Sequence, residues 1–137
     1  MSALTAYPLI TVKDLSASRD FFVMHFDMGV VFEASWVVML SSGADGTISL
    51  GLMMADHPSN PPGPEVFNGQ GMIMTMQVED VSDVYARLQR SGVPIVHPLK
   101  DEPWGQRRFV TRDPSGVLVD VVEQIDPAPG FWDKYLE

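Results

Sequence analysis

Cysteine is absent from the 137-residue chain. Its absence excludes disulfides, thiolate metal sites and a cysteine nucleophile. Basic residues are scarce too, because nine Lys and Arg stand against eighteen Asp and Glu, a formal net charge of −9. Nucleic acid is therefore a poor partner, since its phosphates would be repelled overall. A cationic ligand agrees with this charge, although acidity that only keeps a chain soluble is the more common cause.

Long apolar runs are also missing. No stretch approaches the roughly 18 apolar residues of a membrane span. The first residues contain neither a basic segment nor a long apolar one, so no secretion signal is expected. Hydrophobic residues nevertheless make up 45% of the chain, which argues against disorder. We expect a cytoplasmic protein of one domain, residues 1–137, with no membrane partner.

The clearest local pattern lies between residues 101 and 123, which read DEPWGQRRFVTRDPSGVLVDVVE. One strand is expected at about 104–111, and a second, strictly alternating, at 117–122. The DPSG segment at 113–116 predicts a tight turn between them, because proline presets φ and glycine accepts a positive φ.

The first half of the chain predicts a strand, a helix and three further strands. Residues 7–12 are β-rich, and Pro8 restricts them to an edge or to the end of a strand. Asp14 or Ser16 is placed to cap a helix that runs to about Phe26, and Gly29 is placed to end it. The later strands are expected at 30–33, 36–40 and 47–54.

A long loop at 56–71, with four prolines and three glycines, precedes a second set of elements. This loop is either a linker or a lid over a site. After it, the pattern predicts a strand at 72–78, a helix that opens at 79–82, a short strand at 95–97 and then the hairpin.

Two short segments indicate that the two halves are related. VKDLS at 12–16 and VEDVS at 78–82 occupy the same strand-to-helix junction. An internal duplication of a β-α-β-β-β module is the best explanation. The modules are expected at about 5–55 and 72–125, joined by loop 56–71. The tail, 126–137, is expected to form either a short helix or a loosely packed end.

These junctions, with PWGQRRF at 103–109 and DPSGVLVDVVE at 113–123, resemble the vicinal oxygen chelate superfamily. That superfamily includes glyoxalase I, extradiol dioxygenases and bleomycin-resistance proteins. The resemblance covers about residues 7–123. It implies an α+β fold in which two tandem βαβββ modules form an open curled barrel around a cleft, commonly as a homodimer.

The superfamily's enzymes hold a divalent metal with His, Gln or Glu side chains from the first and last strands of each module. By resemblance, three of these positions fall on Tyr7, Ile73 and Asp120. The fourth lies within 47–54, a stretch without His, carboxylate or amide side chains. A hard divalent ion needs several oxygen or imidazole ligands, and Asp120 with a tyrosine phenol does not supply them. We therefore expect no metal and no cofactor.

Side-chain alternation identifies candidate ligand-binding residues. If Asp120 faces the cleft, then Tyr7, Ile73 and Thr75 face it by the same logic. Such a surface, apolar with a few polar groups, is typical of small-molecule sites. For Asp120 the alternative is a structural ion pair with Arg107 or Arg108.

Three residues near the hairpin's first strand are further candidates. Trp104 is placed to stack on a planar ligand or to pack into the core. Gln106 shares its face by alternation. Arg107 is a candidate clamp for a carboxylate or phosphate, but it belongs to the other face unless Gly105 marks a bulge. In the first module, Trp36 lines either a ligand wall or the core.

Three functions follow from these observations. The leading one is a metal-free module that holds a small apolar or aromatic ligand, with an antibiotic as one version. The alternative is a metal-dependent lyase, isomerase or dioxygenase that recruits Asp120 with His57 or His97. A third is a metal-independent enzyme that uses Tyr7 and Asp120 as an acid–base pair.

Overall fold

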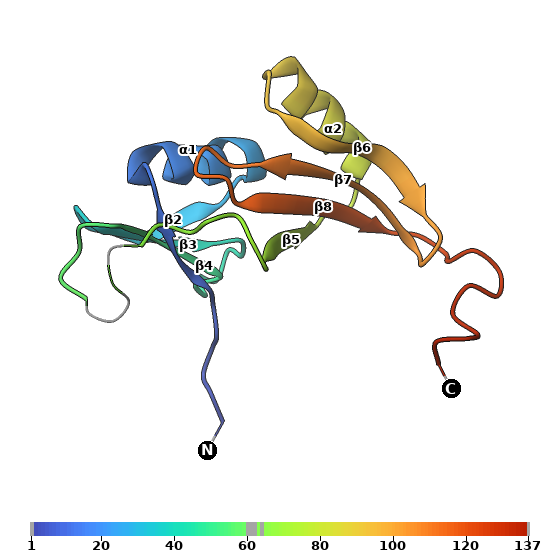
Figure 1. Ribbon diagram of the computed structural model, residues 1–137, viewed down its shortest axis with the longest axis horizontal. Helices are drawn as coiled ribbons and strands as arrows, with labels where there is room; N and C mark the ends of the chain where they lie inside the picture. The colour runs from blue at the N-terminus through green and yellow to red at the C-terminus, as the bar shows by residue number, and fades with distance from the viewer. Residues whose placement is uncertain (1, 60–62, 64, 137) are drawn as a thin grey trace. The chain divides into compact units, whose positions relative to one another are not determined.

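The computed structural model describes residues 2–59, 63 and 65–136 (Figure 1). The chain divides into two compact units, which are described separately below. Unit 1 comprises Met1–Gln70 with Asp113–Gly116, and unit 2 comprises Gly71–Arg112 with Val117–Glu137. Part of the predicted loop at 56–71, residues 60–62 and 64, lies outside the described residues.

Unit 1 contains one helix and a four-stranded sheet. The strand order is β1-β4-β3-β2, in which β1 runs parallel to β4 and the other neighbours are antiparallel. The elements are β1 (Leu9–Val12), α1 (Leu15–Phe26), β2 (Gly29–Glu33), β3 (Val37–Ser41) and β4 (Leu50–Met54).

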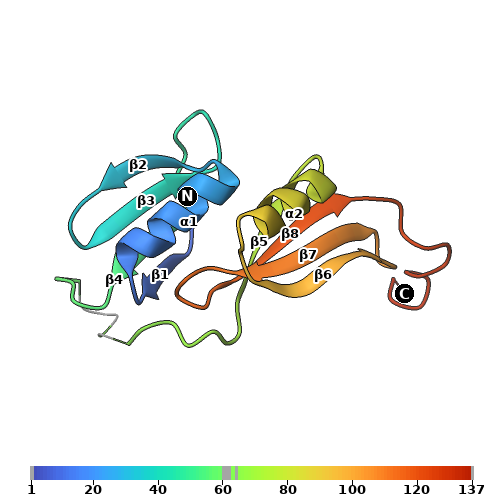
Figure 2. The same cartoon turned by 90° about the horizontal axis from the view of Figure 1, so that it is seen from above.

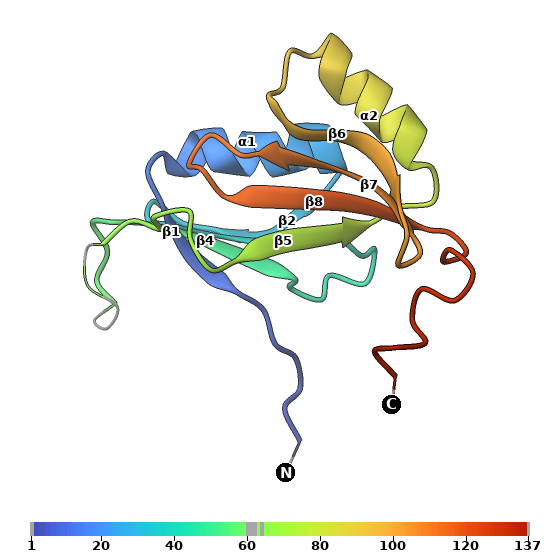
Figure 3. The ribbon, with the colours of Figure 1, turned by 45° about the vertical axis from the view of Figure 1, so that its right-hand side comes forward.

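Unit 2 repeats this arrangement. Its strand order is β5-β8-β7-β6, and β5 again runs parallel to the last strand, β8, beside which it lies in Figure 3. The elements are β5 (Ile73–Gln77), α2 (Val81–Arg90), β6 (Ile95–Glu102), β7 (Gln106–Arg112) and β8 (Leu118–Gln124). The predicted α+β fold of two βαβββ modules is therefore confirmed, and both sheets are open.

Each helix covers one face of its own sheet (Figure 2). Phe21 and Phe22 of α1 are buried, as are Val81 and Leu88 of α2. Apolar side chains of the strands complete the two cores: Ile10, Val12, Val38, Leu40, Leu50 and Leu52 in unit 1, and Phe109, Val119 and Val121 in unit 2.

Both helices begin at the aspartate of the duplicated junction. The Asp14 carboxylate accepts a hydrogen bond from the Ala17 amide at 3.0 Å. The Asp80 carboxylate accepts one from the Asp83 amide at 3.1 Å. These bonds satisfy amide groups that have no partner within the first turn of a helix, so the sequence repeat reflects a repeated N-cap.

Several predicted boundaries were wrong, among them the start of β4, which is Leu50 and not residue 47. Gly29 does not end α1: Asp27 does so in the left-handed conformation, with φ 54°, and Gly29 opens β2. The strand predicted at 95–97 continues to Glu102, because β6 passes Pro98 with an irregular register. For the tail, where a short helix and a loosely packed end were both expected alternatives, the structure shows turns over residues 129–135 and no helix.

Candidate functional site

Asp120 lies on the face of its sheet that is turned away from α2. It stands opposite Thr75 of β5 and Val110 of β7. The next residues along these strands point the other way, since Phe109 pairs with Val121 and its ring lies 5.0 Å from that of Tyr85 in α2. Asp120 is therefore separated from the helix-covered core, as alternation predicts.

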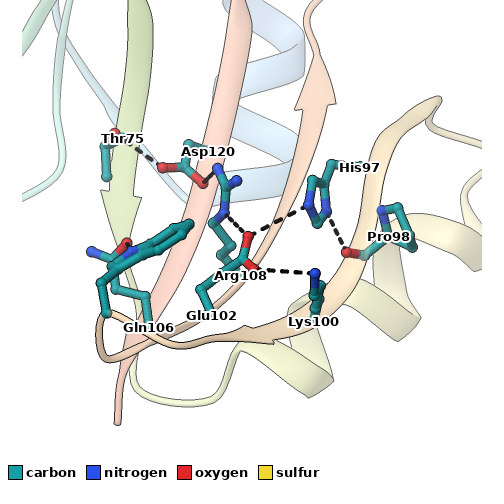
Figure 4. A network of polar contacts seen from close by, with 9 residues as sticks. Thr75, His97, Pro98, Lys100, Glu102, Gln106, Arg108 and Asp120 are labelled. Atoms are coloured by element: carbon teal, nitrogen blue, oxygen red, sulfur yellow. Dashed lines mark hydrogen bonds and ion pairs between the residues drawn. The ribbon is translucent and has the colours of Figure 1, made fainter. Parts of the chain in front are cut away.

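Charged side chains gather around Asp120 in a set that we call the Asp120 network (Figure 4). Arg108 donates from Nε to Glu102 at 2.8 Å, and its Nη1 lies 3.5 Å from Asp120 Oδ1. Thr75 Oγ1 lies 3.4 Å from Asp120 Oδ2. Two side chains of β6 also lie close to the Glu102 carboxylate: His97 Nε2 at 3.5 Å and Lys100 Nζ at 3.7 Å. The network comprises Thr75, His97, Lys100, Glu102, Arg108 and Asp120.

Glu102 lies within 4 Å of three basic side chains of this network, those of Arg108, Lys100 and His97. Burial is the largest single influence and acts to raise the pKa of the carboxyl group, but the hydrogen bond and charge of Arg108, with smaller contributions from Lys100 and His97, together outweigh it. The pKa of Glu102 is consequently lowered. Burial also opposes the charge of Arg108, yet Glu102 and Asp120 together raise the pKa of its guanidinium group. Glu102 and Arg108 are therefore both charged at neutral pH.

Trp104 borders the network. The Arg108 Cζ atom lies 5.3 Å from the centre of the Trp104 ring, a cation–π geometry. The indole N–H donates to Gln106 Oε1 at 2.9 Å, so Trp104 and Gln106 share a face as predicted. The tail covers part of Trp104, because Phe131 lies 6.5 Å away between ring centres and the Trp132 indole donates to the Trp104 carbonyl at 2.9 Å.

Arg107 lies on the opposite face from Asp120. It forms a bidentate pair with Asp101 at 2.6 and 3.2 Å and lies 3.7 Å from Glu123. Gly105 adopts φ 113° in the turn before β7, and alternation then runs undisturbed from Gln106. Of the two arginines considered as partners of Asp120, the structure selects Arg108.

The remaining predicted residues divide between the two units. In unit 2, Ile73 is 52% exposed on the strand beside β8. In unit 1, Tyr7 is 37% exposed, and Trp36 stacks on His57 with ring centres 6.4 Å apart. A separate pocket of about 430 Å³ in unit 1 contains none of the predicted residues; it is lined by Lys13, Asp14, Leu15, Ser16, Glu33, Ala34, Ser35 and Met54.

The duplicated modules locate the fourth metal position implied by the family. The junction repeat aligns Val12 with Val78, and hence Leu9 with Thr75. Leu9 pairs with Gly51, whereas Thr75 pairs with Asp120. Gly51 is therefore the counterpart of Asp120 in the first module.

Gly51 has no side chain that could bind a metal, and its neighbours leave little room for one. A Cβ atom there would lie 2.9 Å from Leu9 Cδ1 and 3.1 Å from Met39 Sδ. Two apolar side chains thus occupy the space into which a ligating carboxylate would project.

The residues present do not fit a divalent metal. The four family positions carry Tyr7, Gly51, Ile73 and Asp120. His97 shares Asp120's face but contacts Glu102, and His57 stacks on Trp36. Within residues 2–59, 63 and 65–136, no group of three or more His, Cys, Asp or Glu side chains is arranged to hold an ion.

The sequence did not identify Glu102 or Lys100 as site residues, because the strand at 95–97 was ended too early. A signal was nevertheless present. Had β6 been extended to the turn, alternation would have placed Lys100 and Glu102 opposite Arg108 and Gln106, as the observed pairing does.

Comparison with known proteins agrees with this fold. The model of the Glyoxalase/Bleomycin resistance protein/Dioxygenase superfamily matches residues 5–121. No curated protein sequence gives a significant match. Among the described residues, neither helix is long and apolar enough to cross a membrane.

Several solved structures share the fold at low sequence identity. A lactoylglutathione lyase from Agrobacterium tumefaciens is 21% identical, with TM-score 0.68 and coverage of 89% of this chain and 94% of that one. A possible glyoxalase from Bacillus cereus is 22% identical, with TM-score 0.68 and coverage of 88% and 99%. A glyoxalase/bleomycin resistance protein/dioxygenase from Nocardioides is 19% identical, with TM-score 0.72 and coverage of 95% and 90%. With the family match over residues 5–121, the chain belongs to the Glyoxalase/Bleomycin resistance protein/Dioxygenase superfamily.

Proposed function

We propose that this chain binds a small, mainly apolar or aromatic molecule without a catalytic metal. One version of this proposal is sequestration of an antibiotic, of the kind for which bleomycin-resistance proteins are named. The surface of unit 2 around Asp120 takes part, with Ile73 and Thr75 beside the carboxylate and Trp104 bordering the network. Apolar side chains next to a few placed polar groups are typical of sites that bind small molecules.

The substitution at Gly51 carries this proposal. Enzymes of this family need several ligand atoms that converge on one ion. In the first module this position is Gly51, and the side chains of Leu9 and Met39 fill the space next to it. The second module offers Asp120, which contacts Arg108 and Thr75. A chain that retains the family fold but not its donor set is better suited to holding a molecule than to activating one.

Isothermal titration tests the proposal. Chelator-treated protein is titrated with bleomycin and with a panel of antibiotics and aromatic metabolites. We expect at least one compound to bind at one molecule per chain, with an affinity that added Zn²⁺, Ni²⁺ or Mn²⁺ does not change. Absence of binding across the panel, or binding that requires an added ion, would contradict the proposal.

A further inference from the structure

Asp120 has weaker hydrogen bonds than a buried carboxylate normally has. The residue is only 9% exposed. Its contacts within the described chain are Arg108 at 3.5 Å and Thr75 at 3.4 Å. Charge-assisted hydrogen bonds usually measure about 2.7–2.9 Å. Both Asp120 contacts are at the outer limit, so the carboxylate keeps most of its acceptor capacity.

The cation nearest Asp120 is already engaged. Arg108 donates its short bond, 2.8 Å, to Glu102 and only its long one to Asp120. Lys100 approaches Glu102 at 3.7 Å and not Asp120. Arg108 is thus the cationic partner of two carboxylates, and its contact with Asp120 is the weaker of the two.

Apolar surface adjoins this carboxylate on the same face. Ile73 stands opposite Leu118, two residues before Asp120 on β8. Ile73 is 52% exposed, and Leu118 is half-buried. Thr75, the member of the network on β5, is also exposed and lies two residues after Ile73. A carboxylate with unused acceptor capacity beside exposed aliphatic side chains suits a ligand that combines a donor group with an apolar body.

We propose that Asp120 binds a positively charged nitrogen, an ammonium or amidinium group, of a small amphipathic ligand whose apolar part lies over Ile73 and Leu118. This inference rests on the proposed binding function and specifies its ligand class. The net charge of −9 favours approach of such a cation over that of an anion.

Matched pairs of probes test the inference: benzamidinium against benzamide, and benzylammonium against benzyl alcohol. Each is titrated into the full ¹⁵N-labelled chain and followed by amide chemical shifts. We expect each cation to bind about tenfold more tightly than its neutral partner, with the largest shifts on β5 and β8. Asp120→Asn, which keeps the side-chain shape, should remove this difference.

Asp101→Asn is the matched control, because it removes the same charge from the opposite face of the same sheet. It should leave the preference for cations intact. Equal binding of cation and neutral partner by the wild type, or a preference retained in Asp120→Asn, would overturn this inference alone. If no probe binds, this inference fails, whereas the proposed binding function fails only if the antibiotic and metabolite panel gives no binding either; the two outcomes are therefore distinguishable.

Discussion

Glu102 contacts two cationic side chains and one histidine in the second sheet. Its side chain is 4% exposed and receives Arg108 at 2.8 Å, with Lys100 and His97 at 3.7 and 3.5 Å. A buried carboxylate in this position stabilises the chain only while its cationic partner remains close. The function proposed for Asp120 also depends on Glu102, because Glu102 keeps Arg108 from closing fully on Asp120.

Replacing Glu102 with Gln should lower the free energy of unfolding by about 1–3 kcal/mol, since Arg108 loses its short charged bond. The 19% exposure of the Arg108 side chain limits this loss, because water screens part of the attraction. Urea unfolding measures the change. Asp101→Asn, at an exposed pair, should cost less; an equal cost for the two variants would contradict the role given to Glu102.

The lowered pKa of Glu102 predicts how this difference depends on pH. A group whose pKa is lower in the folded state than in the unfolded state adds stability above its unfolded value, here the ordinary 4.5. That stability disappears as the pH falls through the lower folded value. The gap between wild type and Glu102→Gln should therefore stay constant near neutral pH and shrink in acid. A gap that widens below pH 4.5 would show the opposite sign.

Some of these residue roles follow from sequence and others do not. Alternation placed Asp120 with Thr75, because side chains alternate between the two faces in regular strands. The prediction that Trp104 and Gln106 share a face agrees with their hydrogen bond, although Trp104 lies in the turn before β7 and not in a strand. It did not choose between Arg107 and Arg108 as the partner of Asp120, since that choice depended on whether Gly105 formed a bulge. Side-chain distances, which show that Asp120 is loosely held, are not encoded in any local pattern.

The paired N-caps are the element-scale feature that the sequence repeat encodes most directly. Asp14→Ala and Asp80→Ala each remove a bond of 3.0 or 3.1 Å to a first-turn amide. Each should lower the free energy of unfolding by about 1 kcal/mol in urea titrations. Asn at the same positions can still accept the bond, so Asp14→Asn and Asp80→Asn should lose little. Equal losses for Asn and Ala would contradict capping as the cause.

The predicted boundaries of helices and strands were wrong where a residue adopts a backbone conformation that its type usually avoids. Asp27 ends α1 at φ 54°, a conformation in which glycine is favoured, and Gly29 two residues later was therefore chosen wrongly. In β6, the strand was predicted to end at His97, and the next residue, Pro98, lacks an amide donor. The strand continues because the register shifts between His97 and Lys100.

At the scale of the whole molecule, the two modules share topology but differ in chemistry. Strand order and pairing direction are the same in both sheets. The equivalent positions nevertheless carry Gly51 and Leu9 in one module and Asp120 and Thr75 in the other. The duplication was visible in sequence, whereas the position of Gly51 opposite Leu9 required the strand register. The expected homodimer stays a prediction, which analytical ultracentrifugation can test.

The metal content of the purified chain tests the central proposal most directly. Untagged protein is dialysed against Zn²⁺, Ni²⁺, Mn²⁺ and Fe²⁺, then against buffer, and analysed for bound elements. We expect no stoichiometric ion, because Tyr7, Gly51, Ile73 and Asp120 do not supply a set of ligands. One tightly held ion per chain, lost in Asp120→Asn, would contradict metal-free binding.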